Sequence, residues 1–362
     1  MLKIGIIGCG YISQKHLDTL LRINRVELAA VSDVQKSKME TAANYYRKAK
    51  GHIGSIEYYE DYLDLIQDEE IDIVLIAVIS GLHGNIAKQA LLAGKHVIVE
   101  KPLALSIEEA DDIISLSKAK QKKVLVCHQL RYRPVMAKIK QVLKEGHLGD
   151  PYLGVASARI NRSPEYYAQA TWRGSWEHDG GMLINQGIHI VDLLIWLLGD
   201  METVYGEIGA GSLHQKETED FAAGIINFSN HAKGVIEVNS VTKPSNQGYS
   251  LSLFCEKGSL TISGNGLDRL DHCFIENGDL LVEELKTLSS KKNEHFYMYQ
   301  NFIDCIENDQ SDLVMDASEG KRALEAIFAI YQSNNLKNPI TMPVTSFSTK
   351  EMKQVSVGRK KT

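Results

Sequence analysis

Short continuous runs of apolar residues alternate with segments of helical periodicity over the first 128 positions. Continuous apolar strands are typical of a parallel sheet covered on both faces, and right-handed crossovers then give a doubly wound arrangement. The pattern therefore predicts a doubly wound α/β domain over residues 1–128. Its expected strands are residues 3–7, 26–31, 71–79, 96–99 and 124–127, and its clearest helices are residues 86–93 and 107–119.

The pattern changes after residue 150, where strands follow one another with few helices between them. This order predicts an α+β domain over residues 129–340, built on an open, mostly antiparallel sheet with one face covered. Residues 341–362 should form a C-terminal segment whose last residues, Arg359 to Lys361, are a frayed tail. We expect strands at residues 152–159, 204–208, 221–228, 234–239, 249–255 and 259–262, and helices at about residues 181–198, 294–306 and 317–333.

Composition narrows the class of protein. A chain of 362 residues suits two domains, and 44% hydrophobic with 24% charged residues is ordinary for a globular protein. The net charge is −6 and the basic residues are scattered, so the electrostatic footprint of a nucleic-acid binder is missing. A strand pattern starts at Leu2, so we expect no signal peptide, and no apolar run is long enough to cross a bilayer.

Five cysteines without CxxC spacing indicate reduced thiols and a cytoplasmic protein. An open sheet face has to be covered, which favours a homo-oligomer, either a dimer or a tetramer. The histidines do not show metal-ligand spacing, so we expect no metal. Neither an activated-serine motif nor a Walker loop is present in the sequence.

A glycine-rich turn follows the first strand and opens a helix. Gly8 allows the tight turn, and Gly10 lets a pyrophosphate approach the backbone amides at the helix N-terminus. The third glycine of the usual fingerprint is replaced by Ser13, which is small enough for helix–strand packing. The turn predicts a Rossmann dinucleotide site.

Asp33 closes the second strand, where a carboxylate accepts hydrogen bonds from the adenosine ribose and repels a 2′-phosphate. This placement favours NAD over NADP, although Lys36 and Lys38 lie close by and weaken the preference. The alternative is that Asp33 only caps the next helix.

Two groups of residues are candidates for catalysis. Lys101, between Glu100 and Pro102, follows a buried strand at the edge where open α/β sheets bind ligands. Asn185 and His189 are four residues apart and would share one face of an otherwise apolar helix. The competing interpretations are that His189 is an inert histidine of the core and that Lys101 is a surface lysine with a structural role only.

The roles of two further residues, Asp192 and His83, stay open at this point. Asp192 either orients the ring of His189 or lies on another face of the helix. His83 follows another parallel strand and either contacts the cofactor or caps its own helix.

With these motifs in this order, the chain resembles the glucose-fructose oxidoreductase, inositol dehydrogenase and MocA-like family over nearly its whole length. The resemblance implies a Rossmann domain with an open-faced α/β domain, and a lysine and a histidine, here Lys101 and His189, that flank the nicotinamide. The sequence departs from the family pattern in two places. The loop at residues 79–83 lacks the proline of many members, and Asn185 stands where many have aspartate.

Motifs at residues 166–167, 169–176, 179–181, 185–186, 242–248 and 256–259 carry a narrower similarity, to the UDP-N-acetylglucosaminuronate 3-dehydrogenases. It implies NAD-dependent oxidation of a sugar hydroxyl, at C3 of a UDP-linked N-acetylhexosamine or hexosaminuronate. An inositol, free-sugar or sugar-phosphate dehydrogenase, a non-catalytic cofactor-binding regulator and a purely structural protein are the alternatives.

The resemblance also implies roles for individual residues. His189 would be the general base, Lys101 would donate a hydrogen bond to the reacting oxygen, and Asn185 would position the hydroxyl. Arg131 and Tyr166 are candidates for substrate contacts, together with Lys101, Asn185 and His189. The expected cofactor-binding residues are Gly8, Gly10, Tyr11, Ile12, Asp33, Ser80, Leu82, His83, Glu100, Lys101, Gln129, Trp172 and Arg173.

Overall fold

The computed structural model describes residues 1–51, 54–211, 216–308 and 312–354, and the chain divides into two compact units. Unit 1 comprises Met1–Gln129 and His295–Gly320, and unit 2 comprises Leu130–Glu294 and the chain from Lys321 onward. The expected tail at residues 359–361 lies outside the described residues.

Unit 1 is built on a six-stranded parallel sheet with the order β3-β2-β1-β4-β5-β6. This is the strand order of the dinucleotide-binding Rossmann fold, so the predicted doubly wound domain is confirmed. Strands β4 and β6 are buried along their whole length, in agreement with their continuous apolar runs. The strands are β1 (Leu2–Ile7), β2 (Val26–Ser32), β3 (Glu57–Tyr59), β4 (Ile73–Ile76), β5 (His96–Val99) and β6 (Val124–Val126).

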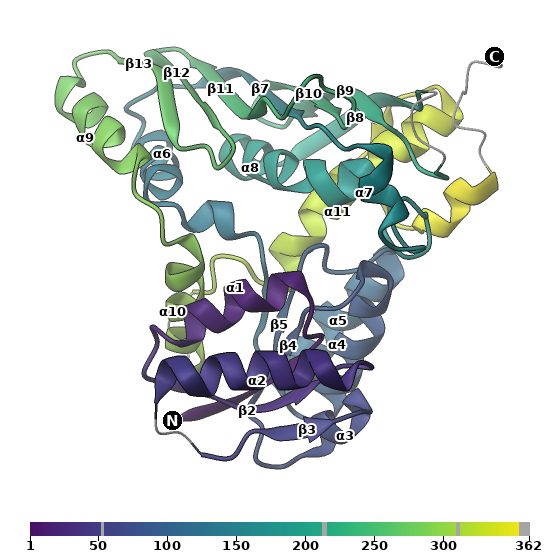
Figure 1. Cartoon of the computed structure of the whole chain (residues 1–362). Coiled ribbons are helices and arrows are strands. Elements are labelled where there is room, and N and C mark those ends of the chain that lie inside the picture. The colour runs from purple at the N-terminus through teal and green to yellow at the C-terminus, as the bar shows by residue number, and fades with distance from the viewer. Residues whose placement is uncertain (52–53, 212–215, 309–311, 355–362) are drawn as a thin grey trace. The chain divides into compact units, whose positions relative to one another are not determined.

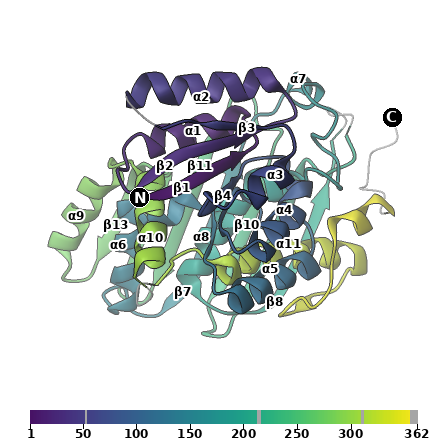
Figure 2. The same cartoon turned by 90° about the horizontal axis from the view of Figure 1, so that it is seen from below.

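Helices cover both faces of this sheet, with α1 and α2 on one face and α3, α4 and α5 on the other (Figures 1 and 2). Right-handed crossovers that leave β1 in opposite directions along the sheet require this division. The helices are α1 (Tyr11–Leu20), α2 (Lys36–Lys50), α3 (Tyr62–Gln67), α4 (His83–Leu92), α5 (Ile107–Lys120) and the late helix α10 (Glu294–Glu307).

Helix α10 returns to unit 1 from far along the chain. Tyr299 hydrogen-bonds to His16 of α1, and Arg25 forms ion pairs with Asp304 and Glu307. The sequence-based division gave all of residues 129–340 to the second domain, whereas the structure groups His295–Gly320 with unit 1. The physical reason is that the buried side of α10 packs against α1.

Unit 2 contains an eight-stranded sheet with the order β13-β12-β11-β7-β10-β9-β8-β14. Its pairs are antiparallel except for β7 with β10, so the mostly antiparallel sheet is confirmed. The strands are β7 (Pro151–Arg159), β8 (Met201–Gly209), β9 (Phe221–Phe228), β10 (Lys233–Asn239), β11 (Gly248–Cys255), β12 (Gly258–Gly264), β13 (Arg269–Ile275) and β14 (Ile340–Thr341).

The helices of unit 2 lie along one face of its sheet (Figure 1). Close packing there requires small residues: a Cβ on Gly154 would come within 2.6 Å of Leu194, and one on Gly206 within 2.9 Å of Ile330. The helices are α6 (Pro134–Lys144), α7 (Pro164–Ala168), α8 (Ile188–Leu198), α9 (Asp279–Ser289) and α11 (Ala317–Leu336), whose first residues belong to unit 1. No helix in the described part of the chain is long and apolar enough to span a membrane.

The other face of this sheet exposes large apolar side chains. Phe274 is 58% exposed, and Phe221, Ile225 and Phe254 are also exposed. The register puts Phe254 and Phe274 in one row, with Ser259 between them. Alternation along β9 (Phe221–Phe228) turns every second residue outward, so these side chains form part of one surface. An apolar sheet surface of this kind is typical of a protein–protein interface.

Candidate functional site

The loops with cofactor-binding candidates in unit 1 lie along one edge of its sheet. The last residues of neighbouring strands are level: Ile7 pairs with Ser32 and with Ile76, and Val99 pairs with Ile76 and Val126. The carboxyl ends of parallel strands form the ligand-binding edge of such sheets. The predicted candidates in Gly8–Gly10, Asp33, Ser80–Leu82, Glu100–Lys101 and Gln129 all come shortly after these strand ends.

The glycine turn fits a pyrophosphate. Gly8 has φ +94°, and a Cβ there would lie 2.5 Å from the carbonyl oxygen of Ala77, so only glycine fits this position. A Cβ on Gly10 would meet nothing within 4 Å. The packing of the chain therefore leaves room for a side chain at position 10. A phosphate that binds the amides of α1 would need this room, which explains a glycine here. Ser13, in place of the third glycine, is buried and donates its hydroxyl to Gly10 O at 2.6 Å.

Asp33 is half-buried and held in place by backbone amides. Its Oδ2 accepts the Cys9 N–H at 2.8 Å and its Oδ1 accepts the Gln35 N–H at 2.9 Å. Helix α2 begins at Lys36 with Gln35 as its N-cap, so Asp33 shapes the preceding turn rather than capping the helix. Each carboxylate oxygen keeps a lone pair that can accept a ribose hydroxyl. These residues together fit NAD.

His83 lies under this edge and not on it. Its ring is 1% exposed, with Nδ1 2.7 Å from the Pro102 carbonyl oxygen and Nε2 3.2 Å from that of Val78. Burial lowers the pKa of His83, so the ring is neutral and donates one proton, which the shorter distance assigns to Pro102. The predicted cofactor contact is wrong for this side chain because the ring is enclosed between two loops. The neighbouring Leu82 is exposed and Ser80 half-buried.

Glu100 is also buried, although it was expected to contact the cofactor. Its carboxylate accepts a hydrogen bond from His16 and one from the backbone N–H of Lys101 at 3.2 Å. The Lys101 side chain itself is half-buried at the end of β5. Glu100 therefore supports Lys101, whereas Lys101 can reach a ligand. On the first turn of α1, Tyr11 is exposed and Ile12 half-buried.

In unit 2, Asn185 and His189 are half-buried positions on an otherwise buried segment. Every residue from Gly181 to Ile195 is described, and these two are the positions in it that are not buried. A π-helical turn, Leu183–Gly187, precedes α8, and such turns are frequent at functional sites. The buried carboxylate of Glu219 accepts the Leu183 N–H at 2.7 Å and so anchors the start of this turn.

Asn185 is part of a polar network in unit 2. Its side-chain amide donates to Asp179, and its Oδ1 accepts Gln186 Nε2 at 2.7 Å. Gln186 in turn accepts Arg162 Nη2 at 2.7 Å. Sequence reasoning did not assign roles to Arg162, Asp179 or Gln186, although two of them stand in the motifs that carried the narrower resemblance.

Tyr166 joins the predicted residues Trp172 and Arg173 to this network. Arg173 donates to the Tyr166 hydroxyl at 2.7 Å, and its guanidinium lies 4.4 Å from the ring centroid of Tyr166 and 4.5 Å from that of Trp172. Arg162 lies 4.8 Å from the Tyr166 ring centroid. Two cations therefore flank one half-exposed tyrosine.

Arg131 does not fit its predicted contact with substrate. The side chain is buried and binds Asp192 through two hydrogen bonds of 2.8 and 2.7 Å. A guanidinium with a buried bidentate partner is not available to a ligand. Asp192 thus pairs with Arg131 in the interior of unit 2.

One group among the described residues has ligand atoms that could hold a metal ion. Atoms of His16, Glu100 and Cys127 lie within 4.8 Å of one another, and all three residues are buried. These side chains hydrogen-bond to each other and to their neighbours, so they are satisfied without a cation.

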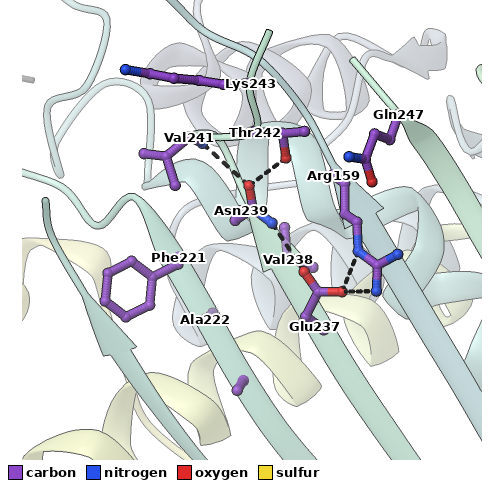
Figure 3. Close-up of a pocket in the computed structure, with 11 residues that line it drawn as sticks. Arg159, Phe221, Ala222, Glu237, Val238, Asn239, Val241, Thr242, Lys243 and Gln247 are labelled. Carbon is purple, nitrogen blue, oxygen red and sulfur yellow. Dashed lines mark hydrogen bonds and ion pairs between the residues drawn. The ribbon is translucent and has the colours of Figure 1, made fainter. Parts of the chain in front are cut away.

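A hollow of about 560 Å³ lies on the outer face of the unit 2 sheet (Figure 3). Arg159 and Glu237 lie side by side in it and form an ion pair of 2.7 Å. None of the predicted site residues lines this hollow. We therefore do not assign the predicted chemistry to it.

Comparisons with known proteins agree with this architecture. A family model described as oxidoreductase family, NAD-binding Rossmann fold (GFO/IDH/MocA) matches residues 2–128, and the GFO/IDH/MocA C-terminal domain matches residues 136–261. Myo-inositol 2-dehydrogenase of Thermotoga maritima is 27% identical over 311 residues, which cover 79% of this chain and 86% of the relative.

Two solved structures are similar over nearly the whole chain. The WlbA dehydrogenase of Chromobacterium violaceum, in complex with NADH and UDP-GlcNAcA, has a TM-score of 0.87 and 28% identity, covering 95% of this chain and 96% of that one. The WlbA dehydrogenase of Bordetella pertussis, in complex with the same ligands, has a TM-score of 0.86 and 29% identity, covering 95% and 98%. The chain is therefore an NAD-dependent oxidoreductase that belongs to the GFO/IDH/MocA family.

Proposed function

We propose that this protein oxidises a sugar secondary hydroxyl, at C3 of a UDP-linked N-acetylhexosamine or hexosaminuronate, by hydride transfer to NAD+. The observation that carries the proposal is the pair Asn185 and His189, which are half-buried on an otherwise buried segment, with Asn185 joined to the network around Tyr166. Support comes from the similarity to the two WlbA dehydrogenases, whose structures hold NADH and UDP-GlcNAcA.

In this proposal unit 1 binds the cofactor. The turn at Gly8 and Gly10 and the amides of α1 take the pyrophosphate, and Asp33 accepts the ribose hydroxyls. When bound, NAD+ supplies the hydride acceptor. Asp33 disfavours a 2′-phosphate because that group would bring a second negative charge against the carboxylate.

In this proposal, three side chains act on the hydroxyl group during its oxidation. His189 takes the hydroxyl proton as general base while the carbon loses hydride. Lys101 donates a hydrogen bond to the oxygen as it becomes a carbonyl. Asn185, whose amide is held by Asp179 and Gln186, positions the substrate hydroxyl.

The charges around Tyr166 favour an anionic substrate. Arg162 and Arg173 both lie over this half-exposed ring, which concentrates positive charge beside Asn185. Guanidinium groups are well suited to phosphate and carboxylate oxygens. A UDP-linked sugar acid carries both kinds of oxygen, whereas an inositol carries neither.

The test is a spectrophotometric screen of NAD+ reduction. We expect turnover with UDP-N-acetylglucosaminuronate or UDP-N-acetylglucosamine and at least about tenfold lower kcat/KM with glucose 6-phosphate and myo-inositol. Lys101→Ala and His189→Ala should each lower kcat by about 100-fold or more while NADH still binds. Lys120→Ala, an exposed lysine at the end of α5, is the control and should keep wild-type turnover. Near-normal turnover in Lys101→Ala would contradict the assignment.

A second candidate is an inositol dehydrogenase, because a curated relative of similar length has that name. Free UDP separates the two proposals, since it should compete with a nucleotide sugar and have no effect on inositol oxidation. A regulator without turnover would bind NADH and fail the whole screen.

The exposed apolar residues on the outer face of the unit 2 sheet support a homo-oligomer, either a dimer or a tetramer. Light scattering of the purified protein tests this part of the proposal. Replacing Phe254 and Phe274 by serine should lower the oligomer mass if the sheet surface is the interface.

A further inference from the structure

A buried hydrogen-bond network in unit 1 ends at the backbone of Lys101. His16 of α1 is fully buried, with Nδ1 2.7 Å from the Tyr299 hydroxyl and Nε2 2.9 Å from Glu100 Oε1. The other carboxylate oxygen, Oε2, accepts the Lys101 N–H at 3.2 Å. Cys127 also hydrogen-bonds to this carboxylate through its thiol. We call Tyr299, His16 and Glu100 the buried relay.

The donors and acceptors of the relay match one another. Burial raises the pKa of the Tyr299 hydroxyl and of the Cys127 thiol, so both keep their protons and can donate. The His16 Nε2 proton points at Glu100 whether the ring is neutral or charged. Glu100 can therefore be a pure acceptor, which is the role of an ionised carboxylate.

Opposing effects act on Glu100. Burial favours the neutral acid, but the hydrogen bond from His16 and the electrostatic interactions with His16, Lys101 and His295 outweigh it and lower the pKa of Glu100 to about 2. An ionised carboxylate forms stronger hydrogen bonds to a backbone N–H than a neutral acid does. The relay thus holds the backbone N–H of Lys101, two residues after the end of β5, with a charge-assisted hydrogen bond.

We propose that His16 and Tyr299 are positioning residues for Lys101: they orient the buried Glu100 carboxylate, which fixes the backbone of Lys101 at the end of β5. The inference rests on the proposed function, in which Lys101 contacts the reacting oxygen. A lysine displaced by about 1 Å from that oxygen loses much of its effect on the rate.

The first test needs no substrate. Hydrogen exchange of the Lys101 amide, followed by mass spectrometry of the surrounding peptide, should be about 3- to 10-fold faster in Tyr299→Phe than in the wild type, the effect of weakening one hydrogen bond. Tyr46→Phe is the matched control, because Tyr46 is equally buried in unit 1 and takes no part in the relay. Equal exchange of this amide in the two variants would overturn the proposal.

The second test is turnover with UDP-N-acetylglucosaminuronate. Tyr299→Phe should lower kcat by about 3- to 10-fold and leave KM for NAD+ within about twofold. Tyr46→Phe should stay within about twofold of the wild type for both parameters. Equal kcat values for the two variants would count against the relay, because a merely structural hydroxyl predicts that result.

The pH profile separates positioning from general damage. In His16→Leu the carboxylate loses its main partner, so its pKa rises and kcat should fall toward the acid end of the range from about pH 5.5 to 9. His16→Gln keeps an N–H that can reach Glu100 and should restore the flat acid limb. Parallel profiles for the wild type and His16→Leu would overturn the proposal, and if His16→Leu does not fold, the exchange result for Tyr299→Phe decides.

Separate measurements test the role of the buried relay and the proposed function. If Lys101→Ala turns over normally, the proposed function is wrong, whatever the relay does. If Lys101→Ala is inactive and Tyr299→Phe matches Tyr46→Phe in both tests, the relay has no positioning role and the proposed function stands.

Discussion

Arg131 and Asp192 form a buried bidentate ion pair in unit 2, with Nε and Nη2 of the guanidinium donating to the two carboxylate oxygens at 2.8 and 2.7 Å. Asp192 is in α8, one turn after His189, so the pair ties the helix that carries the proposed base to the segment that enters unit 2. Its role is to hold α8 in place.

We predict that Asp192→Asn lowers the free energy of unfolding by about 3 to 5 kcal/mol, because a buried guanidinium loses its counter-charge. Urea denaturation measures this change. Glu283→Gln is the control, since it removes one partner of the exposed ion pair with Lys286 and should cost less than about 1 kcal/mol. Similar costs for the two variants would show that the buried pair is not needed to hold α8.

Periodicity was enough to predict most elements of the fold. Runs such as β4 and β5 are apolar throughout and buried, so their pattern indicates a covered parallel strand. The exposed edge strand β3 and the polar strand β13 were missed because burial imposes little pattern on them. The return of α10 to unit 1 was also missed, since its partner His16 is 283 residues from Tyr299 and spacing cannot show a contact of that length.

The candidate site was predictable where a local pattern carries the chemistry. Asn185 and His189 stand out because they are polar positions on an apolar helix at a spacing of four. Arg131 was misjudged for the opposite reason. Its partner Asp192 is 61 residues away along the sequence. A sequence alone does not distinguish an arginine that is buried with a carboxylate partner from one that binds an anionic ligand.

Asp33→Asn should weaken NADH binding by about 5- to 30-fold, the effect of losing one charged hydrogen bond to the ribose. The fold should survive, because the asparagine side-chain oxygen can still accept one of the two backbone amides now bound by Asp33. A fluorescence titration with NADH measures the change. Asp18→Asn removes the same charge from the exposed surface of α1 and should leave NADH affinity unchanged; equal losses in both variants would point to net charge alone.

His83 should make the stability of unit 1 depend on pH. Burial lowers the pKa of this histidine in the folded state, while the unfolded chain has a value of about 6.5. The unfolded state therefore binds a proton first as the pH falls, and stability that is full above about pH 6.5 decreases below it until the folded-state pKa is passed.

Urea denaturation at several pH values tests this dependence. His83→Gln should flatten the loss of stability between about pH 7.5 and 5, because that side chain does not titrate. His272→Gln is the control, since His272 is exposed on β13 and its replacement should leave the slope unchanged. An unchanged slope in His83→Gln would show that this ring is not the source.

Substitution of Gly181, with Gly199 as the matched control, tests how the turn that carries Asn185 is held in place. Both have positive φ, +109° and +106°, so alanine costs about 1 to 2 kcal/mol of backbone strain at either position. A Cβ at Gly199 meets nothing within 4 Å, whereas one at Gly181 would lie 2.5 Å from the Tyr331 hydroxyl and 2.7 Å from Glu219 Oε2. That side chain would displace the carboxylate that anchors Leu183.

We therefore expect Gly181→Ala to lower the free energy of unfolding by about 1 to 3 kcal/mol more than Gly199→Ala does, because overpacking adds to the same backbone strain. Gly181→Ala should also reduce kcat, since the turn that positions Asn185 loses its anchor, while Gly199→Ala should retain it. Denaturation and turnover of the two variants, measured side by side, check both parts. Equal stability losses would mean that Tyr331 and Glu219 move aside without cost, and Glu219 would then not be the anchor of this turn.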